Sequence, residues 1–170
     1  NNMLNKTLKT QDKDFVVAID TDSIYLSLEE LVEKVAADRD TEGKIKYMDR
    51  ICEEVLQPFI DQGYQELAEY MNAYSQKMIM KREVLADKAI WTAKKRYVIN
   101  VHNSEGVQFA KPKVKVMGLE MVKSSTPAVI RDKLRDSLQV ILHGTEKDLH
   151  KYVLDFKKEF DKLPVSEIAF

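Results

Sequence analysis

Cysteine, glycine and proline are scarce in this sequence, and long apolar runs are missing. The single cysteine, Cys52, excludes an internal disulfide and a cysteine-based zinc cluster, and it is typical of a reducing, intracellular setting. No apolar stretch approaches the roughly 18 residues that a membrane-spanning helix needs. Asn1 to Leu4 also lack the basic head and apolar stretch of a secretory signal. With 44% hydrophobic and 32% charged residues, the chain is predicted to be globular, with no membrane partner.

The chain also lacks an excess of either charge. Lysine and arginine number 27 and aspartate and glutamate 28, so the net charge of −1 does not indicate a nucleic-acid partner. The basic residues are unevenly distributed, however, because seven lie between Lys77 and Arg96 against two acidic residues there. Lys111, Lys113, Lys115 and Lys123 extend this basic tract. A length of 170 residues allows one domain or a little more.

The residue pattern predicts an α+β fold, with an antiparallel sheet, packed helices and a final antiparallel helix pair. The apolar run 15–19 and residues 24–26 are predicted strands, and Asp20-Thr21-Asp22-Ser23 is a typical turn between them. Ser27 followed three residues later by Glu30 is a capping-box pattern, which predicts that a helix begins at this point.

The middle of the chain predicts one long helix followed by strands. Apolar residues at helical spacing run from 47 to 74, and Pro58 is expected to bend or break that helix because proline lacks an N–H donor. Residues 90–101 and 107–109 are predicted strands of an antiparallel meander. In this interpretation Lys94 to Tyr97 lie within a strand.

The C-terminal third predicts two helices joined by a tight turn. Thr126 and Pro127 form an N-cap followed by proline at the first helical position, and Thr145 with Asp148 caps the next helix. The composition changes near Gly118, which makes this residue the best candidate for a domain boundary.

Asp20 and Asp22 are the strongest local signal for chemistry. A buried strand delivers two carboxylates, two residues apart, to a tight turn. Magnesium prefers hard oxygen ligands, and one or two carboxylates with a substrate's phosphates is a common arrangement. The alternative is that the two aspartates only favour the turn.

Lys94-Lys95-Arg96-Tyr97 is the second candidate. Its basic side chains could meet phosphate oxygens of a nucleic acid. The alternative is an edge strand whose lysines prevent aggregation.

These motifs together carry a resemblance to a known family. Residues 20–25 (DTDSIY), 94–97 (KKRY), 115–120 (KVMGLE) and 123–127 (KSSTP) resemble, in order and spacing, consecutive landmarks of the family B DNA polymerases of T-even-type bacteriophages. The stretch 64–72 is similar to the same enzymes. The resemblance covers nearly the whole chain from Phe15 onward. One departure is Ala18-Ile19, where family members often have glycine before the first aspartate.

The resemblance implies a division into polymerase subdomains. Residues 1–13 are expected to be a flexible N-terminal segment, 14–117 part of a palm subdomain and 118–170 the start of a thumb. Asp22 resembles the palm carboxylate that ligates two magnesium ions, and Asp20 the neighbouring catalytic aspartate near the primer end. Glu83 resembles an acidic residue close to the metals.

The resemblance also implies partners. The residues expected to bind primer-template DNA are Lys94, Lys95, Arg96, Tyr97, Lys115, Lys123, Ser124 and Ser125. A deoxynucleoside triphosphate and the remainder of a polymerase, namely the upstream palm, the fingers and the exonuclease, are the other expected partners. The expected location is the cytoplasm of an infected bacterial host.

The motifs that would complete a polymerase site do not occur in the sequence. A two-metal mechanism needs a second carboxylate strand and groups that bind the triphosphate. The chain is therefore expected to be a fragment of a DNA-directed DNA polymerase with half of a two-metal site, inactive alone. Two alternatives stay open: a non-catalytic duplex-binding module, and a haloacid-dehalogenase-like phosphatase, whose nucleophile and acid also follow an apolar strand as Asp-x-Asp.

Overall fold

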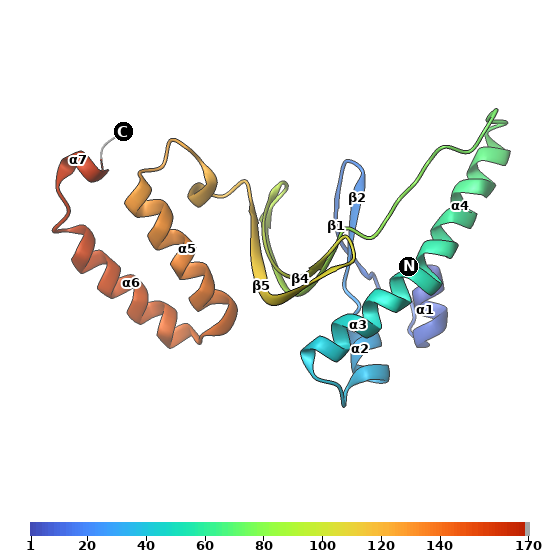
Figure 1. Ribbon diagram of the computed structural model, residues 1–170, viewed down its shortest axis with the longest axis horizontal. Helices are drawn as coiled ribbons and strands as arrows, with labels where there is room; N and C mark the ends of the chain where they lie inside the picture. Colours follow the sequence, from blue (N-terminus) through green and yellow to red (C-terminus); the bar gives the residue numbers. More distant parts are fainter. Residues whose placement is uncertain (169–170) are drawn as a thin grey trace. The chain divides into compact units, whose positions relative to one another are not determined.

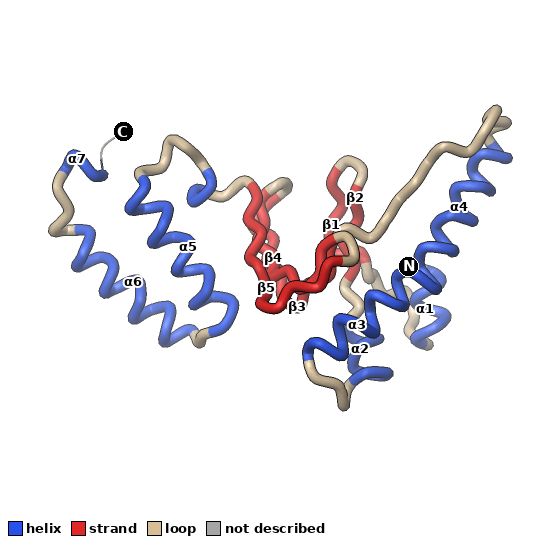
Figure 2. Tube along the Cα trace, in the orientation of Figure 1, coloured by secondary structure: helices blue, strands red, loops and turns tan. Residues whose placement is uncertain are grey.

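The computed structural model describes residues 1–168 and has the predicted α+β fold, with helices and two small antiparallel sheets (Figures 1 and 2). The chain divides into two compact units. The first contains residues 1–86 and 101–112, and the second contains residues 87–100 and the chain from 113 onward. Among the described residues, no helix is long and apolar enough to cross a membrane.

The first unit begins with a helix that the sequence did not predict. Helix α1 (Asn2–Leu8) lies in the segment expected to be a flexible extension. Leu4 and Leu8, one turn apart, are buried in an apolar cluster with Phe15. A helix shorter than about 12 residues is marginal in water, so burial against this cluster, and not local propensity, accounts for the element. This part of the segment is therefore structured.

An antiparallel hairpin follows, as predicted. Strand β1 (Val16–Asp20) pairs with β2 (Ser23–Leu26), with Ile19 opposite Ile24 and Asp20 opposite Ser23. The register is irregular between Val16 and Ala18. The two-residue connection therefore brings Thr21 and Asp22 to the tip.

The predicted capping box at Ser27 is wrong. Helix α2 (Glu29–Ala36) begins two residues later with Leu28 at its N-cap, and no side chain caps it. The Ser27 N–H instead donates to the Phe15 carbonyl at 2.8 Å, which extends the hairpin by one bond. The Glu30 carboxylate pairs with Lys13. Ser27 therefore continues the strand pairing, and the Ser27 N–H and the Glu30 carboxylate, which a capping box would join, have other partners.

The long helix predicted around Pro58 is interrupted as expected. Helix α3 (Thr41–Ile51) passes into a π-helical turn (Cys52–Leu56) and then α4 (Gln57–Tyr70). The Gln57 N–H donates to the carbonyl of Cys52, five residues earlier. Proline cannot donate such a bond, and the wider π turn directly before Pro58 accommodates that loss. Helix α4 ends at Tyr70, short of the predicted residue 74.

The predicted meander is present, with one correction. Strands β3 (Val84–Ala93), β4 (Arg96–Ser104) and β5 (Val107–Met117) form a sheet in the order β3-β4-β5. Lys94 and Lys95 form the turn between β3 and β4 and do not lie in a strand. Lys95 has a φ of 60°, which strand geometry excludes. The sheet supplies strand residues to both compact units.

The second unit packs helices against part of this sheet. Val98 of β4 is buried with Met121, Leu138 and Leu142. The helical elements are a 3₁₀ turn, η2 (Glu120–Val122), and helices α5 (Ala128–His143), α6 (Glu146–Phe160) and α7 (Val165–Ile168). Helices α5 and α6 lie side by side and antiparallel, as predicted (Figure 1).

The two predicted caps of this helix pair have different outcomes. Pro127 itself is the N-cap of α5, with an extended ψ of 144°, so the predicted cap at Thr126 is wrong by one residue. The Thr145 hydroxyl accepts from the Asp148 N–H, and the Asp148 carboxylate accepts from the Thr145 N–H. This confirms the second prediction, because a capping box depends only on groups within one turn.

Candidate active-site and nucleic-acid-binding residues

The acidic hairpin presents its two aspartates in different surroundings. Asp20 ends β1 and is half-buried, and its carboxylate accepts a 3.3 Å hydrogen bond from the Thr21 hydroxyl. The Ser23 hydroxyl donates to the Asp20 carbonyl at 3.1 Å. Asp22 is exposed at the tip. Thr21, the residue between the two aspartates, has a φ of 53°, in the left-handed region that tight turns use.

Glu83 lies in the same compact unit as the hairpin, immediately before β3. It is exposed, and its carbonyl accepts from the Glu105 N–H at 2.7 Å. Within residues 1–168, no three histidine, cysteine, aspartate or glutamate side chains are grouped to hold a metal ion. The exposed Asp22 carboxylate is the kind of oxygen ligand that magnesium prefers.

The residue before Glu83 belongs to a buried polar network that sequence reasoning missed. The Arg82 guanidinium pairs with Asp49 of α3 and donates to the Asn103 side chain of β4 at 2.8 Å. The Arg82 side chain is 14% exposed, and Asn103 is 2% exposed. The Gly106 N–H donates to the same Asn103 oxygen. The network connects the segment that carries Glu83 to α3 and to the β4–β5 turn. No local sequence motif predicts this network.

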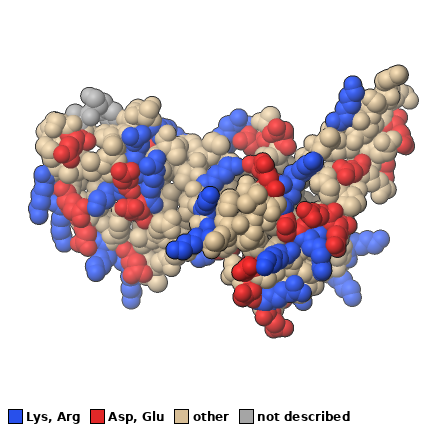
Figure 3. All heavy atoms as spheres, viewed as in Figure 1, with Lys and Arg blue, Asp and Glu red and all other residues tan. Residues whose placement is uncertain are grey.

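The basic turn presents its charges to solvent. Lys94, Lys95 and Arg96 are exposed. Tyr97 is only 5% exposed, and its ring lies 6.3 Å from that of Trp91, centroid to centroid. The largely buried tyrosine therefore offers little ring surface. In Figure 3, lysine and arginine side chains gather over the three-stranded sheet, whereas both signs of charge mix over α5 and α6.

The structure brings this turn together with the segment that follows β5. Gly118 has a φ of +67°, and a Cβ there would lie well within 3.0 Å of the Lys95 carbonyl oxygen. Two residues on, the Glu120 carboxylate accepts from Lys123 at 2.8 Å and lies 3.8 Å from the Arg96 guanidinium. Two basic motifs about 25 residues apart in the sequence therefore form one surface, which we call the basic surface. Its remaining predicted members are the half-buried Lys115 and the exposed Ser124 and Ser125.

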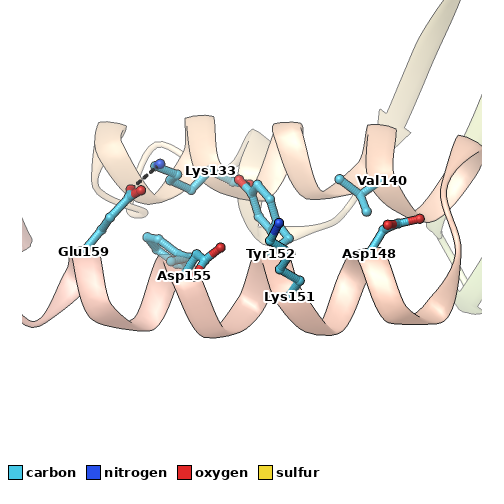
Figure 4. A pocket seen from close by; sticks show the side chains of 8 residues that line it. Lys133, Val140, Asp148, Lys151, Tyr152, Asp155 and Glu159 are labelled. Carbon is cyan, nitrogen blue, oxygen red and sulfur yellow. Dashed lines mark hydrogen bonds and ion pairs between the residues drawn. The ribbon is translucent and has the colours of Figure 1, made fainter.

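A shallow cavity of about 250 Å³ between α5 and α6 is separate from the predicted site residues (Figure 4). Across it, Lys133 pairs with Glu159, and the Tyr152 hydroxyl donates to the Lys133 carbonyl at 2.8 Å. The hydrogen bond that Lys133 donates to the Glu159 carboxylate raises the pKa of Lys133, and burial raises the pKa of Tyr152. Both groups keep their protons at neutral pH, and their contacts hold the helix pair together.

Comparison with known proteins agrees with these motifs. The family model for divergent family B DNA polymerases matches residues 5–156. The chain is 38% identical to the DNA-directed DNA polymerase of Enterobacteria phage T4, over 99% of this chain and 20% of that protein. It is also 38% identical to the DNA-directed DNA polymerase of Escherichia phage RB69, over 86% of this chain and 17% of that protein.

The chain thus spans about a fifth of the length of these curated relatives. The resemblance inferred from four short motifs is confirmed over almost the whole sequence. This chain belongs to the divergent family B DNA polymerases.

Proposed function

We propose that this chain is a part of a DNA-directed DNA polymerase that supplies half of a two-metal nucleotidyl-transfer site and part of the surface that binds primer-template DNA. The observation that carries the proposal is the hairpin that holds Asp20 and Asp22 at a tight turn, in a chain 38% identical to phage polymerases. The antiparallel pairing also disfavours the phosphatase alternative, because such enzymes place the acidic pair after a strand of a parallel sheet.

In this proposal the hairpin residues have different roles. Asp22, exposed at the tip, contributes carboxylate oxygens to magnesium. We expect Glu83, which belongs to the same compact unit, to lie near the metal without being the main ligand. Asp20, held by Thr21, lies near the primer end. When bound, magnesium would lower the pKa of the attacking hydroxyl and stabilise the charge on the phosphates. Further ligands must come from the remainder of the polymerase, so we expect this chain alone to be inactive.

The basic surface is the proposed contact with duplex DNA. Lys94, Lys95 and Arg96 are exposed cations that can meet backbone phosphates, and Lys115, Lys123, Ser124 and Ser125 extend the contact. Such contacts bind without sequence preference and weaken with salt. In the whole protein we assign residues 14–117 to the palm and 118–170 to the start of the thumb. Its substrates would be primer-template DNA and deoxynucleoside triphosphates, in the cytoplasm of an infected bacterium.

Salt-dependent DNA binding tests the assignment of the basic surface. If about four phosphates are neutralised, log affinity for a short duplex should fall against log salt with a slope of roughly −3 to −4. Replacing Lys95 and Arg96 together by alanine should flatten that slope by about one to two units. The matched control replaces Lys157 and Lys158 of α6 by alanine, which removes the same charge and should change the slope less. Equal slopes for the two variants would show that DNA contacts a surface other than the basic surface.

Primer extension tests the catalytic assignment. The isolated chain should leave a primer unextended in the presence of magnesium and nucleotides. In a polymerase restored with the missing segments, Asp22→Ala should abolish extension, because an anionic ligand is lost, whereas Asp20→Ala should impair it less. Retention of activity by Asp22→Ala with loss in Asp20→Ala would reverse the two roles. Unchanged extension in both variants would favour the alternative of a non-catalytic duplex-binding module.

A further inference from the structure

Glu120 lies among cations that the proposed function assigns to DNA. It is the first residue of η2, directly after Gly118 and Leu119. One carboxylate oxygen lies 2.8 Å from the Lys123 ammonium and 3.8 Å from the Arg96 guanidinium. All three side chains are about half exposed, at 55% for Glu120, 40% for Lys123 and 48% for Arg96. The acidic group is therefore the shared counter-ion of two solvent-accessible cations from different elements.

The surrounding fold fixes the backbone position of Glu120. Met121, the next residue, is 5% exposed and is buried with Val98 and Leu138. Gly118 lets the chain approach the Lys95 carbonyl closely, which brings η2 beside the start of β4. Lys123 is three residues after Glu120, a spacing at which helical side chains meet. The position of Glu120 thus follows from a buried anchor on one side and a close backbone approach on the other.

The chemistry of this arrangement resembles that of a bound phosphate. A carboxylate and a phosphate both offer anionic oxygens to the same ammonium and guanidinium donors. The hydrogen bond from Lys123 lowers the pKa of Glu120, so the carboxylate is ionised at neutral pH. Ion pairs between exposed groups are weak. A phosphate of the DNA backbone could therefore replace the carboxylate readily.

We propose that Glu120 is an internal counter-ion that occupies the phosphate-binding positions of Arg96 and Lys123 until backbone phosphate displaces it, and that it thereby lowers the affinity for duplex DNA. The inference rests on the proposed DNA-binding function and adds a residue that sets its strength. In the DNA-free chain the two cations are neutralised and held in one geometry. In the complex they face phosphate, and Glu120 turns to solvent.

The test compares two variants of the full 170-residue chain with the same change in charge. Glu120→Gln removes the proposed counter-ion. Glu159→Gln is the matched control, because Glu159 also pairs with a lysine of the second unit, Lys133, but lies on the α5–α6 pair. Binding to a fluorescein-labelled 20-base-pair duplex is measured by anisotropy over a range of sodium chloride concentrations, and circular dichroism checks that each variant is folded.

We expect Glu120→Gln to bind the duplex about two- to fivefold more tightly than wild type, as the strength of an exposed ion pair implies. Glu159→Gln should change the affinity less. When Arg96 and Lys123 are both replaced by glutamine, adding Glu120→Gln should give little further gain, because the cations that it would release are gone.

The outcomes separate this inference from the function on which it rests. Equal gains for Glu120→Gln and Glu159→Gln would overturn it, since only net charge would matter. A gain that persists without Arg96 and Lys123 would also overturn it, because the carboxylate would then act by long-range repulsion of DNA. If neither wild type nor Glu120→Gln shows salt-dependent duplex binding, the proposed function of the basic surface fails and this inference fails with it.

Discussion

Replacing Gly118 by alanine should destabilise the second compact unit more than an ordinary glycine substitution does. The φ of Gly118 is +67°, a region that costs an L-residue about 1–2 kcal/mol. Its new Cβ would also meet the Lys95 carbonyl oxygen at less than 3.0 Å, a separation that real Cβ atoms essentially never show, and would lie 3.2 Å from Arg96 Cγ. The Lys95 oxygen is backbone, so relief requires movement of the whole β3–β4 turn.

The two effects can be added for an expected magnitude. Forcing an extra methyl group into a tight contact costs about 1–3 kcal/mol, so we expect a total loss of roughly 2–5 kcal/mol in the free energy of unfolding. Urea unfolding should detect it as a midpoint lower by about 1–2.5 M, for a urea m-value of about 2 kcal/mol/M. Trp91, the single tryptophan, lies in this unit beside Tyr97, so its fluorescence reports on the affected strands.

Gly106→Ala is the matched control for backbone strain. Gly106 also has a positive φ, +87°, but nothing lies within 4 Å of its would-be Cβ. Gly106→Ala should lower the free energy of unfolding only by the cost of the positive φ, about 1–2 kcal/mol. Circular dichroism in the same urea series measures this loss. If Gly118→Ala loses no more stability than Gly106→Ala, then the close approach to Lys95 does not constrain the basic surface, and the physical argument for Gly118 is refuted.

Three further predictions concern stability and reactivity. Asp49→Asn should lower the free energy of unfolding by about 2–4 kcal/mol, because it leaves the 14%-exposed Arg82 side chain without its counter-charge; a loss no larger than that of the surface change Asp61→Asn would contradict this. Thr145→Ala should lower it by about 1 kcal/mol through loss of the α6 cap. The hydrogen bonds from Thr145 hold the pKa of Asp148 below its usual 3.8. The stabilisation that Asp148 gives the folded state is therefore fully present above pH 3.8 and disappears as the pH falls through the folded-state pKa. Asp148→Asn should remove this pH dependence of stability in acid titrations. Burial raises the pKa of the Cys52 thiol, so a thiol reagent should modify Cys52 slowly in the native chain and quickly in the urea-unfolded chain. Fast labelling of the native chain would contradict this and show that the π-helical turn opens.

The sequence predicts the structural position of some proposed site residues but not of others. The tip position of Asp22 was predictable, because two apolar strands separated by turn residues allow few other arrangements. The exposure of Lys94 and Lys95 was expected, but their strand assignment was wrong, since short basic runs are compatible with either a strand or a turn. The contact of Arg96 with Glu120 joins residues more than twenty positions apart, and no local pattern encodes it.

Features set by neighbours within one turn or hairpin were determined by the sequence alone. The Thr145 capping box, the β1–β2 hairpin and the interruption of the long helix before Pro58 belong to this class, because their hydrogen bonds or sterics join residues at most about ten positions apart. The family also followed from short motifs in order. Tertiary structure decided the rest. Burial of Leu4 and Leu8 against Phe15 makes a helix of a segment too short to be stable by itself, and the Phe15 carbonyl accepts the Ser27 N–H that a capping box would have joined to the Glu30 carboxylate. The close approach of Gly118 to Lys95 likewise exists only once β4, β5 and η2 pack together, because an interatomic distance across three elements is a property of their packing and not of any one segment.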